Sequence, residues 1–395
     1  MKQQFEAAVA RMTTASNLER IAISIAALVA SILVGGVVVL VAGFVAQCSQ
    51  PVLFFPGVGY SCYNPVSVYV ELFLGPFSGP GVFGETLQQT TILLLTGLSV
   101  AIAFRAGLFN IGTQGQFVMG SMATAIVVPL LAPAVPANAV GALILIPLGL
   151  LAGALVGGLY GAIPGALKAY AEANEVITTI MLNFIATFLA LLIVSTWFKD
   201  PNSTNNTQTA KVPDFAMLDS SVLPGDFSFI ALALALTLVA TISWLLVKTA
   251  FGYDLRISGI QEGAAAYSGV NAKKMTVLSM ALSGALGGIA GAVYILMVTG
   301  RWLPTAPAFG FDGITVSILA GNNPVGAIFA AFLFGILKVG RIAIDFNLDV
   351  PSQLVGVLRG LIILFVAMPE FFRMFGTRFN VGSDMAVTTD GGEDT

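Results

Sequence analysis

Long apolar runs alternate with short polar stretches along most of the chain. A run of about 20 apolar residues is long enough to cross a bilayer as a helix. The pattern predicts ten membrane segments, at about residues 21–46, 86–104, 109–131, 139–163, 175–197, 227–249, 275–298, 309–323, 326–343 and 352–370. The second and third segments, and the eighth and ninth, are joined too tightly for ordinary loops, so we expect breaks or re-entrant turns there. The sequence therefore predicts an all-α membrane protein with about ten transmembrane helices.

Lysine and arginine residues predict the orientation of these segments. Lys2, Arg11 and Arg20 precede the first segment, and further basic residues lie in the connection 250–274 and after the tenth segment. With ten spans they all fall on one side, which the positive-inside rule makes cytoplasmic. The prediction is a cytoplasmic N-terminal segment, one transmembrane domain, two outer loops, a cytoplasmic loop and a cytoplasmic, disordered tail, at residues 1–20, 21–370, 47–85, 198–226, 250–274 and 371–395 respectively.

The order of segments also predicts internal symmetry. Segments two to five and seven to ten each form a block of four, and the two blocks begin on opposite sides of the membrane. This is the arrangement of an inverted repeat, whose interface commonly holds a transport path. Glycines four residues apart, from Gly149 to Gly165, and a second set from Gly284 to Gly291, are typical of close helix packing.

Composition narrows the class of function. Hydrophobic residues make up 57% of the chain and charged residues 9%, whereas a soluble domain has about 25% charged residues. The net charge of −3 and the lack of a basic run argue against a nucleic-acid partner. The sequence contains no histidine, the usual general base and commonest metal ligand, so we expect neither a catalytic site nor a metal site. Cys48 and Cys62 fall in one predicted outer loop, where a disulfide and two free thiols remain equally open.

The most informative polar stretch is Ala-Phe-Arg-Ala-Gly-Leu-Phe-Asn-Ile-Gly-Thr-Gln-Gly-Gln, residues 103–116. It places Arg105, Asn110, Gln114 and Gln116 between two apolar runs. Unsatisfied polar groups in a bilayer core cost several kcal/mol each. The stretch therefore either lines a polar path or breaks a helix at a membrane boundary.

Four further residues can have a structural or a functional role. Glu175 begins a predicted helix, where its charge complements the helix dipole. Thr179 and Asn183 follow on one face, and either join helices through hydrogen bonds or touch a polar solute. Asp312 is an ionisable residue near a membrane segment, a default sign of function, but we favour a helix cap there and a turn at 322–324.

The connection 250–274 has the features of a docking element. Residues 261–267 can form a short helix that Gly269 would end. Apolar and small residues in this connection are more than a solvated loop needs. No glycine in the chain is followed by lysine, so the phosphate-binding loop of nucleotide-binding proteins is absent. If ATP drives this protein, another subunit binds the ATP.

These stretches resemble a known family. Residues 103–116, 174–183, 256–274 and 320–326 are similar to the membrane permeases of bacterial ATP-binding-cassette (ABC) importers. The nearest resemblance is to the branched-chain amino acid, ribose and nucleoside permease superfamily. The first two stretches look like its nucleoside, or simple-sugar, branch.

The resemblance implies a type II ABC importer-like bundle in a bacterial plasma membrane. It implies the larger permease of a heterodimer, with a second homologous permease, two ABC ATPase subunits and an extracytoplasmic substrate-binding protein as partners. The chain itself would carry no cofactor, since ATP is bound by the partner. The solute would be a nucleoside or, alternatively, a simple sugar such as ribose. The resemblance implies path residues Phe109, Asn110, Gln114, Gln116, Thr179 and Asn183, and residues that couple to the ATPase at Arg256, Gly259, Glu262, Ala265, Tyr267 and Gly269.

Two other classes of function remain as alternatives. A stand-alone secondary transporter needs an intramembrane ionisable residue, for which Asp312 is the main candidate and Glu175 the second. A membrane enzyme has the least support, because the chain lacks histidine, a metal cluster motif and a nucleophile triad.

Overall fold

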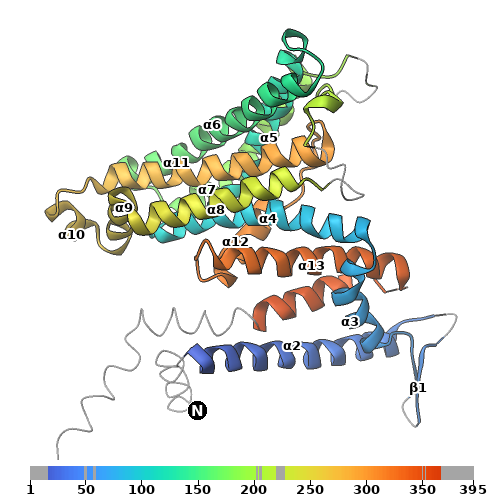
Figure 1. Cartoon of the computed structure of the whole chain (residues 1–395). Coiled ribbons are helices and arrows are strands. Elements are labelled where there is room, and N and C mark those ends of the chain that lie inside the picture. Colours follow the sequence, from blue (N-terminus) through green and yellow to red (C-terminus); the bar gives the residue numbers. More distant parts are fainter. Residues whose placement is uncertain are drawn as a thin grey trace, which may run out of the picture. The chain divides into compact units, whose positions relative to one another are not determined.

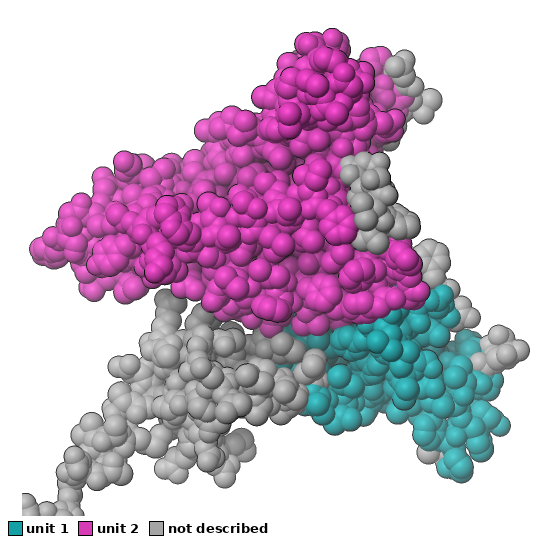
Figure 2. Space-filling model, in the orientation of Figure 1, with its two compact units in different colours: residues 1–75, 340–395 teal, residues 76–339 magenta. Residues whose placement is uncertain are grey.

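The computed structural model describes residues 17–48, 51–56, 59–201, 203, 207–218, 227–348, 350–351 and 353–365. The predictions for the tail 371–395 and for most of the N-terminal segment lie outside these residues. The chain forms two compact units, one of residues 1–75 and 340–395 and one of residues 76–339 (Figure 2). The division into segments, loops and one transmembrane domain remains a prediction.

The larger unit is a helical bundle (Figure 1). Its elements are α4 (Pro80–Arg105), α5 (Thr113–Leu131), η2 (Ala132–Ala134), α6 (Ala139–Ala171), α7 (Glu175–Trp197), η3 (Asp214–Ala216), α8 (Phe229–Lys248), α9 (Ala250–Ile260), α10 (Glu262–Tyr267), α11 (Ala272–Tyr294), the π-helix η4 (Ile295–Thr299), α12 (Phe309–Leu319) and most of α13 (Gly326–Asn347).

Each of the ten predicted membrane segments contains a helix. Among the described residues, seven helices are long and apolar enough to cross a membrane, and the helix over the eighth segment, α12, has only 11 residues. Boundaries differ at some ends. Helix α5 begins at Thr113 and not near 109, and α4 begins at Pro80, a residue suited to the first helical position. Helix α9 and the structure within 47–85 were not predicted from the sequence.

Asparagine side chains begin several of these helices. Asn138 accepts hydrogen bonds from two backbone N–H groups in the first turn of α6, and Asn174 does so for α7. Asn271 accepts one from the Lys274 N–H at the start of α11. Each bond satisfies an N–H group that has no partner within its helix.

Helices α6 and α11 lie side by side and pack through glycine (Figure 1). A Cβ on Gly288 would lie 2.0 Å from the Gly153 carbonyl oxygen, and one on Gly157 would lie 2.5 Å from the Gly284 carbonyl oxygen. The two backbones therefore touch, which confirms the packing role predicted for both glycine sets.

The two predicted four-helix blocks exchange contacts in a reciprocal way. Helix α4 of the first block packs on α12 of the second, and α11 of the second packs on α5 of the first. Gly313, the fifth residue of α12, would place a Cβ 2.7 Å from the Thr96 carbonyl carbon. Gly291 would place one 2.2 Å from the carbonyl oxygen of Phe117, the fifth residue of α5. An inverted repeat predicts such paired contacts.

The smaller unit combines helices with a short hairpin. It contains α2 (Asn17–Val45), β1 (Leu53–Phe55), β2 (Gly59–Ser61), α3 (Pro65–Leu74) and a short apolar helix, Gln353–Phe365. The antiparallel strands pair Leu53 with Ser61 and Phe55 with Gly59. The η1 turn (Gly75–Phe77) links α3 to the larger unit.

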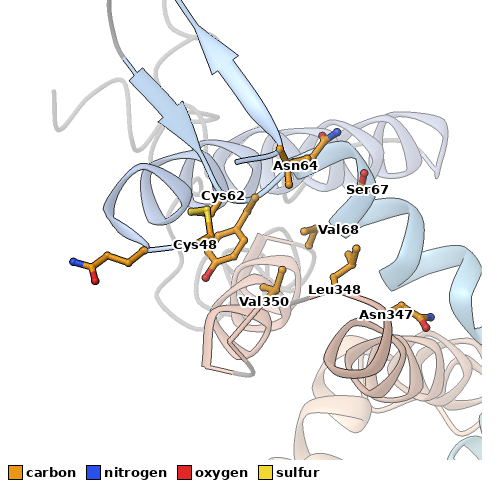
Figure 3. Close-up of a pocket in the computed structure, with 11 residues that line it drawn as sticks. Cys48, Cys62, Asn64, Ser67, Val68, Asn347, Leu348 and Val350 are labelled. Atoms are coloured by element: carbon orange, nitrogen blue, oxygen red, sulfur yellow. A yellow bond between two sulfur atoms is a disulfide. The ribbon is translucent and has the colours of Figure 1, made fainter. Parts of the chain in front are cut away.

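A disulfide joins Cys48 to Cys62, which decides between the two alternatives left open for these cysteines. The Cys62 N–H also donates to the Gly43 carbonyl, 3.0 Å away, so the hairpin folds back onto the end of α2. The disulfide borders a pocket of about 550 Å³, to which Asn64 and Val350 contribute from distant parts of the sequence (Figure 3).

Candidate functional site

The chain turns back on itself after α4. Helix α12 runs alongside α4 in the same direction, because Gly313 touches Thr96 and the Arg105 Nε donates to the Asn322 carbonyl, 2.9 Å away. Thr96 precedes Arg105 by nine residues, about 13 Å of helix. Near the start of α5, the Gln114 Oε1 accepts a hydrogen bond of 2.8 Å from Gly310, one turn before Gly313. Residues 106–112 therefore return at least about 13 Å along α4. We call residues 106–112 the re-entrant segment. The sequence predicted a break or a re-entrant turn at this junction.

A second irregular segment leads from the end of α11 and η4 to the start of α12, which lies beside the start of α5. Residues 300–308, here called the return segment, follow η4 and end at α12. Their backbone is irregular, and Thr305 and Ala308 are exposed. At its end, Phe309 packs against Phe117 and Tyr294, with ring centroids 5.9 and 5.7 Å away. Exposed irregular backbone at membrane depth is tolerated where it lines a water-filled cavity or meets another protein. This segment was not predicted from the sequence, although its prolines between two apolar runs are a signal for such a site.

Gln114 joins the two irregular segments. Besides its bond from Gly310, its Nε2 donates to the Pro307 carbonyl at 3.0 Å. Both ends of this amide are therefore used within the chain, and the side chain is buried. Gln114 fixes where the return segment ends relative to the start of α5.

Asn110 and Gln116 hold the shape of the re-entrant segment. The Asn110 Nδ2 donates to the Gln116 Oε1 at 3.1 Å and to the Ser283 hydroxyl at 2.7 Å. Its Oδ1 accepts from the Gly112 N–H at 2.9 Å. Ser283 and Ser99 in turn exchange hydroxyl-to-carbonyl bonds of 2.6 Å in each direction. The network links α4, the re-entrant segment and α11, and every member is buried.

Thr179 and Asn183 bring α7 against the same segment. The Asn183 Oδ1 accepts from the Gly115 N–H at 2.7 Å, and its Nδ2 donates to the Ile111 carbonyl at 3.0 Å. Thr179 is buried, and a Cβ on Gly112 would lie 3.2 Å from it. Asn183 thus has the joining role left open for this pair, whereas the Thr179 hydroxyl donates within α7, to the Glu175 carbonyl at 2.6 Å. Contact with a solute remains a prediction.

Phe109 differs from the other predicted path residues because it is exposed. Its side chain is 40% accessible, whereas Asn110, Gln114, Gln116, Thr179 and Asn183 are all buried. Its ring centroid lies 4.7 Å from that of Phe104, on the last turn of α4. An aromatic face is therefore available beside the re-entrant segment.

Asp312 has a partner that the sequence did not reveal. It lies in the first turn of α12, where a carboxylate suits the helix dipole. The predicted cap is wrong, because the N-cap residue of α12 is Ala308 and no described side chain caps this helix. Its Oδ2 is 3.1 Å from the Nζ of Lys338 on α13, and this Nζ is 3.6 Å from the centroid of the Phe309 ring. The Asn322–Pro324 stretch forms the predicted turn, with Asn322 in the left-handed conformation. Glu175 begins α7 as predicted and pairs with Lys168 at 3.0 Å.

Helices α9 and α10 form one end of the bundle (Figure 1). The predicted short helix is present as α10, and Gly269 with φ +81° ends the turn that follows it. Tyr267 is 97% exposed, and Glu262 and Gly269 line a surface pocket of about 530 Å³. Ala265 is buried, and the Arg256 Nε donates to the Gly252 carbonyl within α9. Gly259, by contrast, packs directly against the re-entrant segment.

Comparison with known proteins places this architecture in a family. Residues 82–367, more than half of the chain, match the family described as branched-chain amino acid transport system / permease component. The chain belongs to this permease family. It is therefore a multi-pass membrane protein and a permease component of a transport system.

Named relatives cover most of the permease. It is 36% identical to the guanosine ABC transporter permease protein NupP of Bacillus subtilis, over 78% of this chain and 87% of NupP. It is 32% identical to the nucleoside ABC transporter permease protein NupB of Lactococcus lactis, over 78% of this chain and 84% of NupB. The glucose ABC transporter permease protein TsgB13 of Haloferax volcanii is 29% identical, over 84% of this chain and 88% of TsgB13.

Proposed function

We propose that this permease is a transmembrane subunit of an ATP-driven importer for nucleosides. The observation that carries the proposal is the 36% and 32% identity to guanosine and nucleoside permeases over more than four fifths of their length. The site is compatible with that cargo, because the groups gathered around the re-entrant segment are amides and hydroxyls. A nucleoside is a neutral solute that needs hydrogen-bonding partners and no counter-charge.

The path runs where the two irregular segments meet. Phe109 on one side, and Thr305 and Ala308 on the other, are exposed beside helix starts that the hydrogen bonds of Gln114 hold in place. Phe109 offers a ring on which a base can stack during passage. The buried amides of Asn110, Gln116 and Asn183 act indirectly on the path, because their hydrogen bonds hold the re-entrant segment in its conformation.

The partners follow from surfaces that this chain leaves uncovered. A second permease would cover the exposed irregular backbone of the return segment, which a lipid tail cannot satisfy. ATPase subunits would bind α10 through the pocket beside Glu262 and the exposed Tyr267 ring. A substrate-binding protein would deliver solute on the opposite side of the membrane and would set most of the selectivity.

Glu262→Arg tests the coupling assignment. The permease is reconstituted in liposomes with its second permease, ATPase and binding protein, and uptake of radiolabelled guanosine is measured with and without ATP. We expect wild-type uptake to require the ATPase, and the variant to lose uptake while solute still binds the binding protein with unchanged affinity. Normal uptake by the variant would remove α10 from the coupling role, and uptake by the permease alone would favour a secondary transporter.

A sugar is the second candidate cargo, because TsgB13 is described as a glucose permease and is 29% identical. Neutral amides and hydroxyls serve a sugar as well as a nucleoside. Competition in the same liposomes separates the two candidates. Excess unlabelled guanosine is expected to block uptake, whereas excess glucose or ribose is not. The reverse result would keep the importer and change its cargo.

A further inference from the structure

The backbone of helix α9 touches the backbone of the re-entrant segment. A Cβ on Gly259 would lie 2.4 Å from the Ala106 carbonyl carbon and 2.6 Å from the Gly107 nitrogen. A Cβ on Gly107 would lie 2.5 Å from the Gly259 carbonyl oxygen. Real Cβ atoms do not approach other atoms so closely, so neither position has room for a larger residue. Gly107 also has φ +70°, a conformation that disfavours side chains.

This contact lies close to the surface proposed to bind the ATPase. Gly259 is followed by Ile260, which ends α9 and is 84% exposed, and α10 begins at Glu262. The α9–α10 junction is one residue long, so a displacement of α10 reaches Gly259 within three residues. No flexible side chain lies between Gly259 and Gly107 to absorb it, and close-packed backbones transmit displacement well.

The residues on either side of the re-entrant segment in turn hold both ends of α12. Next to Gly107, Arg105 donates to the carbonyl of Asn322, beyond the C-terminal end of α12. At the other end, Gln114 bonds Gly310 in the first turn of α12 and Pro307 in the return segment. Residues 105–114 thus connect one end of α12 to the other. A push on Gly107 therefore reaches the helix and the irregular backbone that border the proposed path.

We propose that the contact between Gly259 and Gly107 carries the movement of α10 to the re-entrant segment and α12, so that both glycines are positioning residues for transport. This rests on the proposed function, because it needs an ATPase to move α10. The connection from α10 into α11 transmits movement along the chain, whereas the glycine contact moves a segment more than 140 residues earlier in the sequence.

A pair of alanine variants tests the contact in the reconstituted importer with all its subunits. Gly259→Ala adds a Cβ at the contact. Gly356→Ala, on the short apolar helix Gln353–Phe365 and outside the surface proposed to bind the ATPase, adds one that would meet nothing within 4 Å. Guanosine uptake and ATP hydrolysis are measured on the same vesicles. We expect Gly259→Ala to hydrolyse ATP but to lose uptake per ATP severalfold, and Gly356→Ala to keep the wild-type ratio. A wild-type ratio in Gly259→Ala would overturn the inference. If the wild-type importer itself takes up no guanosine in the presence of ATP, the proposed function is overturned instead.

A distance measurement covers the case in which Gly259→Ala does not assemble. Spin labels are placed at Phe109→Cys and Ile260→Cys, both exposed positions, and a second pair uses Trp197→Cys with Ile260→Cys. The native cysteines are joined to each other and do not react. Between nucleotide-free and ATP-trapped complexes, we expect the 109–260 distance to stay constant and the 197–260 distance to change. A 109–260 distance that changes as much as the 197–260 distance would show that the two glycines part, against the inference.

Discussion

Asp312 on α12 and Lys338 on α13 form an ion pair, with 3.1 Å between the carboxylate Oδ2 and the Nζ. Their side chains are only 16% and 21% exposed, and the Lys338 charge also lies over the Phe309 ring. Removing one partner of a largely buried pair leaves a charge without compensation, whereas removing both leaves none. The pair therefore sets a specific expectation for stability.

We expect Lys338→Met to lower the free energy of unfolding by about 3 kcal/mol, the usual size for breaking a buried pair. The double variant Asp312→Asn/Lys338→Met is expected to recover most of the loss. Thermal unfolding of the purified permease in detergent measures both. A double variant less stable than Lys338→Met alone would show that the pair has another role.

The same pair bears on the secondary-transporter alternative. A carboxylate that binds protons or sodium during a transport cycle must be able to exchange its partner. Asp312 is held by a lysine in this conformation, and Glu175, the other candidate, pairs with Lys168. Both carboxylates suggested for ion coupling are thus already paired with cations, which favours a structural role for each.

The sequence predicted features that depend on local pattern. Each of the ten apolar runs contains a helix, and α10 forms within residues 261–267, where a short helix was predicted. The polar cluster of Asn110, Gln114 and Gln116 was recognised because amides are costly in a bilayer. Their partners Ser283 and Gly310 were not, because the hydrogen bonds that join them span more than 170 residues.

The sequence also does not predict where one helix begins relative to another in space. The prolines of the return segment, 300–308, mark an interruption between two apolar runs, but only packing places the start of α12 beside the start of α5. The contact of Gly259 with Gly107 leaves no signal at all, because a glycine is equally at home in a turn, a packing face and an exposed helix. Gly263, whose Cβ would meet nothing, looks the same in the sequence.

Asn183 provides a test of how the re-entrant segment is held. In Asn183→Leu, the Gly115 N–H and the Ile111 carbonyl lose their partners, and each unsatisfied group costs about 1–3 kcal/mol. We expect a lower unfolding temperature and reduced uptake. Thr178→Ala, at a half-buried position of the same helix where the hydroxyl donates to the Asn174 and Glu175 carbonyls, is the control, with an expected effect of less than about 0.5 kcal/mol. Equal effects of the two variants would count against the joining role.

Gly288 tests the packing of α11 against α6. The Cβ of Gly288→Ala would lie 2.0 Å from the Gly153 carbonyl oxygen, so the helices must move apart, at an expected cost of about 1–3 kcal/mol. Gly356→Ala, where a Cβ meets nothing within 4 Å, is the matched control and should be neutral or slightly stabilising. Thermal unfolding of both proteins decides, and a neutral Gly288→Ala would mean that this packing is looser than described.

The Cys48–Cys62 disulfide allows the predicted orientation to be tested, because residues 47–85 are expected outside the cytoplasm. A membrane-impermeant phosphine reductant is added to intact cells, and free thiols are then labelled with a maleimide polymer and detected by gel shift. We expect two labelled cysteines after reduction and none before. The Cys48→Ser/Cys62→Ser variant should give no shift in either sample. Full protection in intact cells, with labelling only after lysis, would place this loop on the cytoplasmic side and reverse the orientation.

The same disulfide is expected to stabilise the fold. Closing a loop of about 15 residues contributes about 3 kcal/mol in the chain-entropy model. Reduction should therefore lower the unfolding temperature of the wild type and leave that of the double variant unchanged.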